Sequence, residues 1–327
     1  MRNAVLYASA PDGASLPVID VTHPAFRVDV TDAELAAMAE RYILESAQRN
    51  DVSPALREAL AQSRFGRALM DVGGSYLPGM ITYLLKVGPE NLAVDVSPID
   101  RRIAASFPAL ATRLRLQDMA LLLADGLSSI CASEPRRPIR LINIAGGAAS
   151  DSWNALICLR ARDAGLLEGR EIVIAVFDVA EDGPVFGMRA IEALRAPEAP
   201  LSGVDLALTH VECDWSRVER LRGALEELDA AQAICAVSSE GGLFEYGTDG
   251  EIVSNLISVH TGTAADAFVV GSVTRDGEVV RASQGTNRVA TRPRTLDAFR
   301  SLIEEAGWMI ERAIERPFSY NVLLVKK

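Results

Sequence analysis

The chain of 327 residues is 49% hydrophobic and carries a formal net charge of −11, with a sequence pI near 4.9. This length suits one large domain or two modest ones, and the acidic balance disfavours nucleic acid, because negative charges repel a phosphate backbone. No apolar run reaches the roughly 18 residues of a membrane helix, and the N-terminus lacks the apolar core of a signal peptide, so we expect a cytoplasmic protein with a small-molecule partner.

The first part of the chain is predicted to be mostly helical. Residues 1–30 look like an extended arm or an edge ribbon, because they hold prolines and few helical signals. Helices are expected at about 31–48, 54–61 and 100–127, the last with a break at Pro108. We interpret residues 1–130 as a helical cap or substrate region, and residues 131–327 as a Rossmann-like domain.

The second part alternates between short apolar strands and helices. The expected strands lie at 139–145, 171–178, 204–211, 233–238 and 267–274. Such alternation predicts a mainly parallel sheet with helices on both faces, whose strands end at one rim, where ligands bind. The four cysteines form no Cys-x-x-Cys pair and only three histidines are present, so we expect no metal site.

The C-terminus adds two strands of opposite direction. A capped helix from Thr295 ends at Gly307, and strands at 308–315 and 318–325 flank a turn at Arg316-Pro317, so they must be antiparallel neighbours. The predicted fold is therefore an α/β, Rossmann-like, doubly wound, seven-stranded sheet with an antiparallel C-terminal hairpin and an N-terminal helical cap.

Two segments carry the candidate chemistry. In the first, Gly146 and Gly147 follow a strand and precede a helix, which permits close backbone approach to a nucleoside-like cofactor. Asp178 ends the next strand, where a carboxylate can accept both ribose hydroxyls, and Glu181 competes for this role. The second segment, Ser239–Tyr246, brings carboxylates and aromatic rings to the same edge of the sheet.

The stretch TLDAFRSLIEEAGWMIERAIERPFSYNVLLVKK resembles the last helix and hairpin of class I S-adenosylmethionine-dependent methyltransferases. Within that superfamily, residues 240–246 (EGGLFEY) are similar to the Glu-Gly-x-Leu-x-Tyr pattern of the leucine carboxyl methyltransferase and polyketide O-methyltransferase-like group, with one extra residue before the tyrosine. The loop Asn143–Ala149 departs from the usual Asp-x-Gly-x-Gly-x-Gly, since an asparagine replaces the acid and alanines replace two glycines. An alanine adopts a positive φ only at a cost.

The resemblance implies that S-adenosylmethionine is the cofactor. Asp214 would accept a hydrogen bond from the adenine amino group, and either Arg113 or Arg115 would hold the methionine carboxylate. We favour Arg113, because two arginines two positions apart point in different directions on a helix. The expected cofactor contacts are Arg113, Ala145, Gly146, Gly147, Asp178, Asp214, Trp215 and Ser239.

Methyl transfer to an oxygen atom of a small molecule is the expected activity. A hydroxyl acceptor needs a base, for which the candidates are His210, Glu240, Tyr246 and His260. A carboxylate acceptor needs none, and Tyr83, Phe244 and Tyr246 would then shape the pocket. Two alternatives stay open: a protein of this fold that binds S-adenosylmethionine or another ligand without transfer, and an NAD(P)-dependent oxidoreductase. The oligomeric state is also open, with a homodimer among the options.

Overall fold

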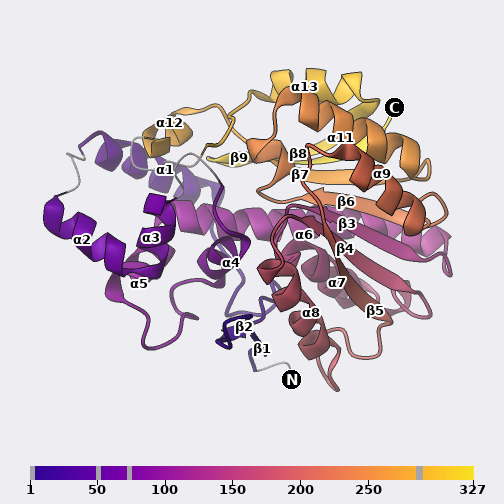
Figure 1. Cartoon of the computed structure of the whole chain (residues 1–327), viewed down its shortest axis with the longest axis horizontal. Helices are drawn as coiled ribbons and strands as arrows, with labels where there is room; N and C mark the ends of the chain where they lie inside the picture. Colours follow the sequence, from indigo (N-terminus) through magenta and orange to yellow (C-terminus); the bar gives the residue numbers. More distant parts are fainter. Residues whose placement is uncertain (1–3, 49–52, 72–75, 285–289) are drawn as a thin grey trace.

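The computed structural model describes residues 4–48, 53–71, 76–284 and 290–327. Its centre is a seven-stranded sheet in the order β5-β4-β3-β6-β7-β9-β8 (Figure 1). The strands are β3 (Ile139–Ile144), β4 (Ile172–Asp178), β5 (Leu206–Glu212), β6 (Ile234–Ser239), β7 (Phe268–Thr274), β8 (Trp308–Glu315) and β9 (Ser319–Lys326). The first five pair in parallel, whereas β9 is antiparallel to both β7 and β8. The predicted sheet with its antiparallel hairpin is confirmed.

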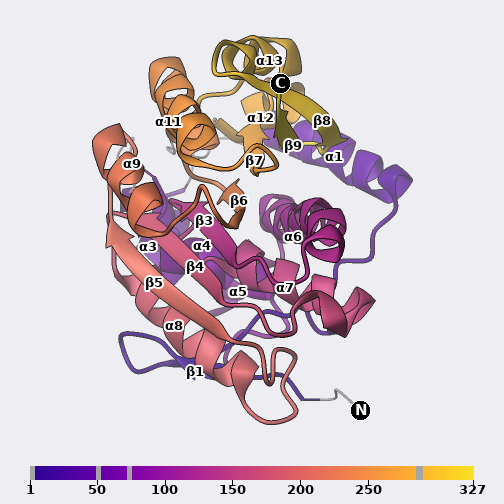
Figure 2. The same cartoon turned by 90° about the vertical axis from the view of Figure 1, so that its right-hand side faces the viewer.

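Helices cover both faces of this sheet (Figure 2). One face packs against α6 (Phe107–Ser133), α7 (Ser150–Arg162) and α8 (Asp182–Arg195), and the other against α9 (Val218–Glu227), α11 (Asp249–Gly262) and α13 (Leu296–Glu305). Successive residues of a strand point to opposite faces, so Leu141 enters the first core and Ile142 the second. A short 3-10 turn, η1 (Ala164–Leu166), and two further helices, α10 (Leu243–Tyr246) and α12 (Glu278–Gln284), lie in the connections.

The order of the strands creates a place for a ligand. From β3 the chain adds β4 and β5 on one side, and then crosses to add β6 and β7 on the other. The segments that follow β3 and β6 therefore leave the sheet in opposite directions. In open α/β sheets, the crevice at such a switch point, beyond the carboxyl ends of the strands, is where ligands bind.

The N-terminal part consists of a small hairpin, β1 (Tyr7–Ser9) with β2 (Ser15–Pro17), followed by helices. These are α1 (Asp32–Ala47), α2 (Pro54–Gln62), α3 (Arg64–Asp71), α4 (Gly79–Val87) and α5 (Pro98–Ala104). Figure 1 shows α1, α2, α3 and α5 grouped to the left of the sheet. The expected break at Pro108 separates α5 from α6, because Ser106 caps α6 and Pro108 lies in its first turn.

The N-terminal elements share one core with the sheet. Buried residues of the arm, of α4 and of α6 belong to the same apolar cluster as those of β3, α7 and α8. The backbone oxygen of Ile19 accepts hydrogen bonds from Trp153 Nε1 at 2.8 Å and Asn154 Nδ2 at 3.0 Å. The proposed boundary near residue 130 therefore crosses a continuous core, and α6 is a sheet-covering helix as well as part of the predicted cap.

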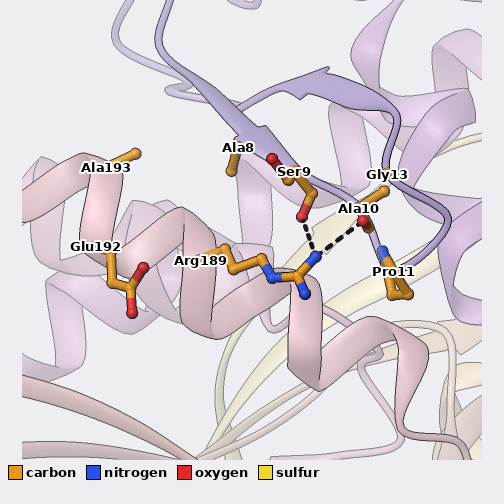
Figure 3. A pocket seen from close by; sticks show the side chains of 8 residues that line it. All are labelled: Ala8, Ser9, Ala10, Pro11, Gly13, Arg189, Glu192 and Ala193. Carbon is orange, nitrogen blue, oxygen red and sulfur yellow. Dashed lines mark hydrogen bonds between the residues drawn. The ribbon is translucent and has the colours of Figure 1, made fainter.

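The β1–β2 hairpin packs on α8, where a shallow groove forms (Figure 3). Arg189 of α8 donates from Nη1 to the backbone oxygens of Ser9 at 2.9 Å and Ala10 at 2.8 Å. These bonds anchor the arm on the outer side of the helix. Within the described part of the chain, no helix is both long and apolar enough to cross a membrane.

Candidate active site

A cavity of about 290 Å³ opens at the carboxyl ends of the parallel strands. Its walls come from the segments after β3, β4, β5 and β6, and from the start of α4. The residues that line it are Tyr76, Leu77, Pro78, Gly79, Thr82, Lys86, Ala145, Gly146, Gly147, Asp178, Val179, Ala180, Cys213, Asp214, Trp215, Glu240, Gly241, Gly242 and Tyr246. The cavity thus occupies the switch point that the strand order predicts.

The loop between β3 and α7 is tightly wound. Gly147 has a φ of 59°, and two alanines also adopt positive values, 55° at Ala145 and 58° at Ala149. The sequence led us to expect that alanine would resist this conformation, and yet the loop keeps it. One reason is that the Ala145 N–H extends the sheet by donating to the Phe177 oxygen at 2.7 Å.

Replacing Ala145 with glycine is expected to stabilise the protein by about 0.5–1 kcal/mol. The left-handed conformation costs a non-glycine residue about 1–2 kcal/mol, which glycine avoids. Part of this gain is offset because glycine has more conformational freedom to lose from the unfolded chain. Urea unfolding measures the change. Ala37→Gly on the exposed side of α1 is the matched control, and there glycine should destabilise by about 1 kcal/mol. Destabilisation by both substitutions would contradict the strain at Ala145.

Two carboxylates stand at the ends of neighbouring strands. Asp178 accepts hydrogen bonds from the Gly147 N–H at 3.1 Å and from the Ala180 N–H at 3.0 Å, one on each oxygen. Asp214 accepts one from the Ser216 N–H at 2.9 Å. Each oxygen atom has two lone pairs, so both carboxylates keep capacity for a ligand. They are fixed by the backbone and face the same cavity.

Aromatic rings form another wall. The Tyr76 ring lies edge-on to both Trp215, at 5.4 Å between ring centroids, and Tyr246, at 5.5 Å. Burial, and then the negative charge of Glu245, raise the pKa of the Tyr246 phenol. Tyr246 therefore enters the cavity as a neutral phenol.

Buried charges close the inner end of the cavity. Glu240 accepts from Lys86 Nζ at 2.5 Å on one oxygen and from Arg115 Nε at 3.0 Å on the other. Arg115 also donates from Nη1 to Glu245 at 2.8 Å. Burial opposes the charge of Arg115, but the attraction of Glu245 and Glu240 prevails and raises its pKa. We call Lys86, Arg115, Glu240 and Glu245 the ion network. It ties α4 and α6 to the end of β6.

Most of the expected cofactor residues meet at this cavity. Those that line it are Ala145, Gly146, Gly147, Asp178, Asp214 and Trp215. Arg113 does not, because its side chain lies against Gly88, and its pKa is lowered by burial, with Glu90 acting in the opposite direction. Arg115 does not line it either, since its guanidinium lies behind the wall and is bound to Glu240 and Glu245. Ser239 also turns away: its hydroxyl donates to the Ile144 oxygen at 3.0 Å and accepts from the Leu243 N–H at 2.9 Å.

The base candidates divide in the same way. Glu240 and Tyr246 line the cavity, whereas His210 and His260 do not. His210 Nε2 donates to the backbone oxygen of Asp178 at 2.9 Å, outside the cavity. His260 packs at the far end of α11 against Trp308, at 5.5 Å between ring centroids. Its pKa is lowered by burial and by Lys326.

Two aromatic residues expected to shape the pocket belong to the core instead. The Tyr83 hydroxyl donates to the Pro17 oxygen at 2.7 Å, and the Phe244 ring packs on Phe299. The sequence also failed to reveal the wall that α4 provides. Gly79 touches the loop so closely that a Cβ there would lie 3.1 Å from Gly147 Cα. The one available signal was Lys86, a lysine within the apolar run MITYLLKV.

Comparisons with known proteins support the fold. No protein-family model matches the sequence, and no curated protein does. Among solved structures, a possible exported protein from Bordetella parapertussis is similar over 91% of this chain and 97% of its own, with 18% identity and a TM-score of 0.59. Two other solved structures are more distant. The mitomycin 7-O-methyltransferase MmcR matches 87% of this chain and 75% of its own, with 12% identity and a TM-score of 0.43. The pyocyanin biosynthetic protein PhzM matches 91% of this chain and 74% of its own, with 15% identity and a TM-score of 0.45.

The strand order itself defines the class of fold. Five parallel strands with a crossover after β5, closed by a reversed hairpin in which β9 lies inside β8, form the class I methyltransferase fold. The resemblance seen in the sequence is thus confirmed at the level of the fold.

Proposed function

We propose that this protein is an S-adenosylmethionine-dependent methyltransferase that acts on a small molecule. The observation that carries this proposal is the pair of carboxylates, Asp178 and Asp214, at the ends of β4 and β5, which face one cavity with the loop Ala145–Gly147. In this proposal Asp178 binds the ribose hydroxyls and Asp214 the adenine amino group, while Trp215 packs beside the ring.

The charge of the cavity suits this cofactor. Among the described lining residues, Lys86 is positive and Asp178, Asp214 and Glu240 are negative, so the lining carries a net formal charge of −2. A sulfonium cation is attracted to such a wall, whereas the pyrophosphate of NAD(P) is repelled. The lysine is already paired with Glu240, which weakens the oxidoreductase alternative further. When bound, S-adenosylmethionine supplies an electrophilic methyl group.

For the acceptor we propose an oxygen atom of a small molecule. Positioning supplies much of the rate of such a displacement, and α4 with the aromatic wall encloses the cavity for that purpose. Of the base candidates, Tyr246 is at the wall, and Glu240 has both oxygens engaged by cations. This engagement of Glu240 favours, as a second candidate, a protein that binds the cofactor without transferring its methyl group.

Calorimetric titration tests the cofactor. S-Adenosylhomocysteine is expected to bind with a micromolar Kd, and NADH is not. Asp178→Ala should weaken binding by about 100-fold, because the ribose loses hydrogen bonds to a charged acceptor. The control is Glu181→Ala, since Glu181 is exposed and lies outside the cavity. This variant should bind S-adenosylhomocysteine with native affinity. Binding of NADH alone, or of neither ligand, would refute the proposal.

Methyl transfer needs a separate measurement. Incubation with methyl-labelled S-adenosylmethionine and a mixture of small hydroxyl and carboxyl compounds should yield labelled product if the protein is a transferase. Cofactor binding without label in any acceptor would favour the second candidate. The cytoplasmic location and the homodimer stay predictions from the sequence.

A further inference from the structure

A buried polar cluster lies directly beneath the cavity loop. Its members, Asn143, Asp151, Ser152 and Ser238, are each at most 2% exposed. Asn143 Nδ2 donates to Asp151 Oδ1 at 2.8 Å and to Ser238 Oγ at 3.0 Å, with Ser152 Oγ at 3.4 Å. The cluster touches the loop, because a Cβ on Gly146 would lie 2.0 Å from Asn143 Oδ1. A movement of the Asn143 side chain would therefore press on the loop at Gly146.

Two oxygens of this cluster have no hydrogen-bond donor. They are Asn143 Oδ1 and Asp151 Oδ2, both fully buried. They belong to the two groups that the bond from Asn143 Nδ2 to Asp151 Oδ1 already joins. A carboxamide and a neutral carboxyl group each offer one donor and one acceptor, whereas a carboxylate offers acceptors only. A proton on Asp151 would therefore turn one acceptor of this cluster into a donor.

Burial, more than the surrounding charges, favours that proton. Glu240, after β6, adds a negative charge, and Lys86 of α4 opposes it from the same side, while Arg115 of α6 is held on the other oxygen of Glu240. Burial, followed by the charge of Glu240, raises the pKa of Asp151 to about 6, against the opposing effects of Ser238, Lys86 and the Ser152 N–H.

The place of the carboxyl group in the sequence fits this arrangement. In the superfamily that the chain resembles, the first residue of the glycine loop is an aspartate, and here it is Asn143. The carboxyl group stands eight residues later instead, at Asp151 in the first turn of α7. The carboxyl group beneath the loop is therefore supplied by helix α7 and not by strand β3.

We propose that Asp151 is a positioning residue for the cavity loop, which it holds as a neutral acid paired with Asn143. Deprotonation sends the Asp151 proton to solvent and leaves a buried carboxylate in the cluster with the unpartnered Asn143 Oδ1. The loop then loses support, and cofactor affinity falls as the pH rises. This inference rests on the proposed function, because the loop is taken to bind S-adenosylmethionine.

Titration of the full-length protein with S-adenosylhomocysteine across pH tests the inference. If only the protonated form binds, affinity should fall by about 25-fold between about pH 5.5 and 7.5, as expected for a group that titrates near pH 6. Asp151→Asn keeps the shape and neutrality of the protonated acid, so its affinity should stay at the low-pH value throughout. Asp205→Asn, an exposed carboxylate before β5, is the control and should keep the native profile.

A second pair of variants separates positioning from general damage. Asn143→Asp places two carboxyl groups in the cluster and should weaken binding at neutral pH. The double exchange Asn143→Asp with Asp151→Asn restores one acid and one amide, and should regain the native affinity to within about threefold. A double variant as weak as Asn143→Asp would overturn the inference.

The outcomes distinguish this inference from the proposed function. Measurable binding whose pH profile is the same in the native protein and Asp151→Asn overturns the role of Asp151 alone. Absence of binding at every pH refutes the proposed function. Thermal unfolding then decides about Asp151: the native Tm should fall relative to that of Asp151→Asn as the pH rises from about 5 to 7.5. Equal pH dependence of the two Tm values overturns the neutral pair.

Discussion

Glu240→Ala is expected to destabilise the protein by about 3–5 kcal/mol, because it leaves Lys86 buried without its anion. Lys86 and Glu240 are 4% and 1% exposed in their side chains, so the unpaired ammonium would be poorly solvated. Arg115 keeps Glu245 but loses its second carboxylate. Urea unfolding measures the free energy of unfolding. The urea concentration at the midpoint of unfolding should fall. The slope of the free energy of unfolding against urea concentration should not change, since the surface exposed on unfolding hardly changes.

The buried lysine, rather than the lost volume, should account for most of this effect. The double variant Lys86→Met with Glu240→Leu removes both charges and keeps apolar volume, so it should recover most of the stability. As a surface control, Asp297→Ala breaks an exposed pair with Arg300 and should cost less than about 1 kcal/mol. A loss below about 1 kcal/mol in Glu240→Ala would contradict the structure of the ion network.

The elements that could be predicted are those with a visible pattern. Strand β7 was expected at 267–274 and occupies Phe268–Thr274, because an apolar run bounded by polar turns marks a buried strand. Helix α4 was missed for the opposite reason. From Met80 to Val87 nearly every residue is buried, so the helix shows no polar face and no period.

The site divides in the same way. Asp178 was predicted because it ends a parallel strand at the edge where ligands bind, and Asp214 because the family resemblance implies an acid after the next strand. The ion network was not, because Lys86 and Arg115 lie 154 and 125 positions from Glu240 in the chain and only tertiary packing joins them. Arg113 and Arg115 are two positions apart on one helix, and their side chains have different partners. The first lies against Gly88, and the second reaches Glu240.

Backbone contact between α8 and the cavity loop leads to the second large prediction. A Cβ on Gly183 of α8 would lie 2.6 Å from the carbonyl carbon of Gly147 and 2.7 Å from its Cα. These are backbone atoms, which cannot rotate away as a side chain does. Gly183→Ala must therefore push the helix off the loop, and with it the Gly147 N–H that Asp178 holds.

We expect Gly183→Ala to destabilise the protein by about 1–3 kcal/mol and to weaken S-adenosylhomocysteine binding by about 100-fold. Gly223→Ala is the matched control, because Gly223 is also helical, in α9, and a Cβ there would meet nothing within 4 Å. In that variant alanine should stabilise the helix by up to about 1 kcal/mol and leave binding unchanged. The two substitutions are chemically identical, so opposite results would trace the loss to the contact with the loop. Native affinity in Gly183→Ala would mean that the loop does not need this contact to bind its ligand.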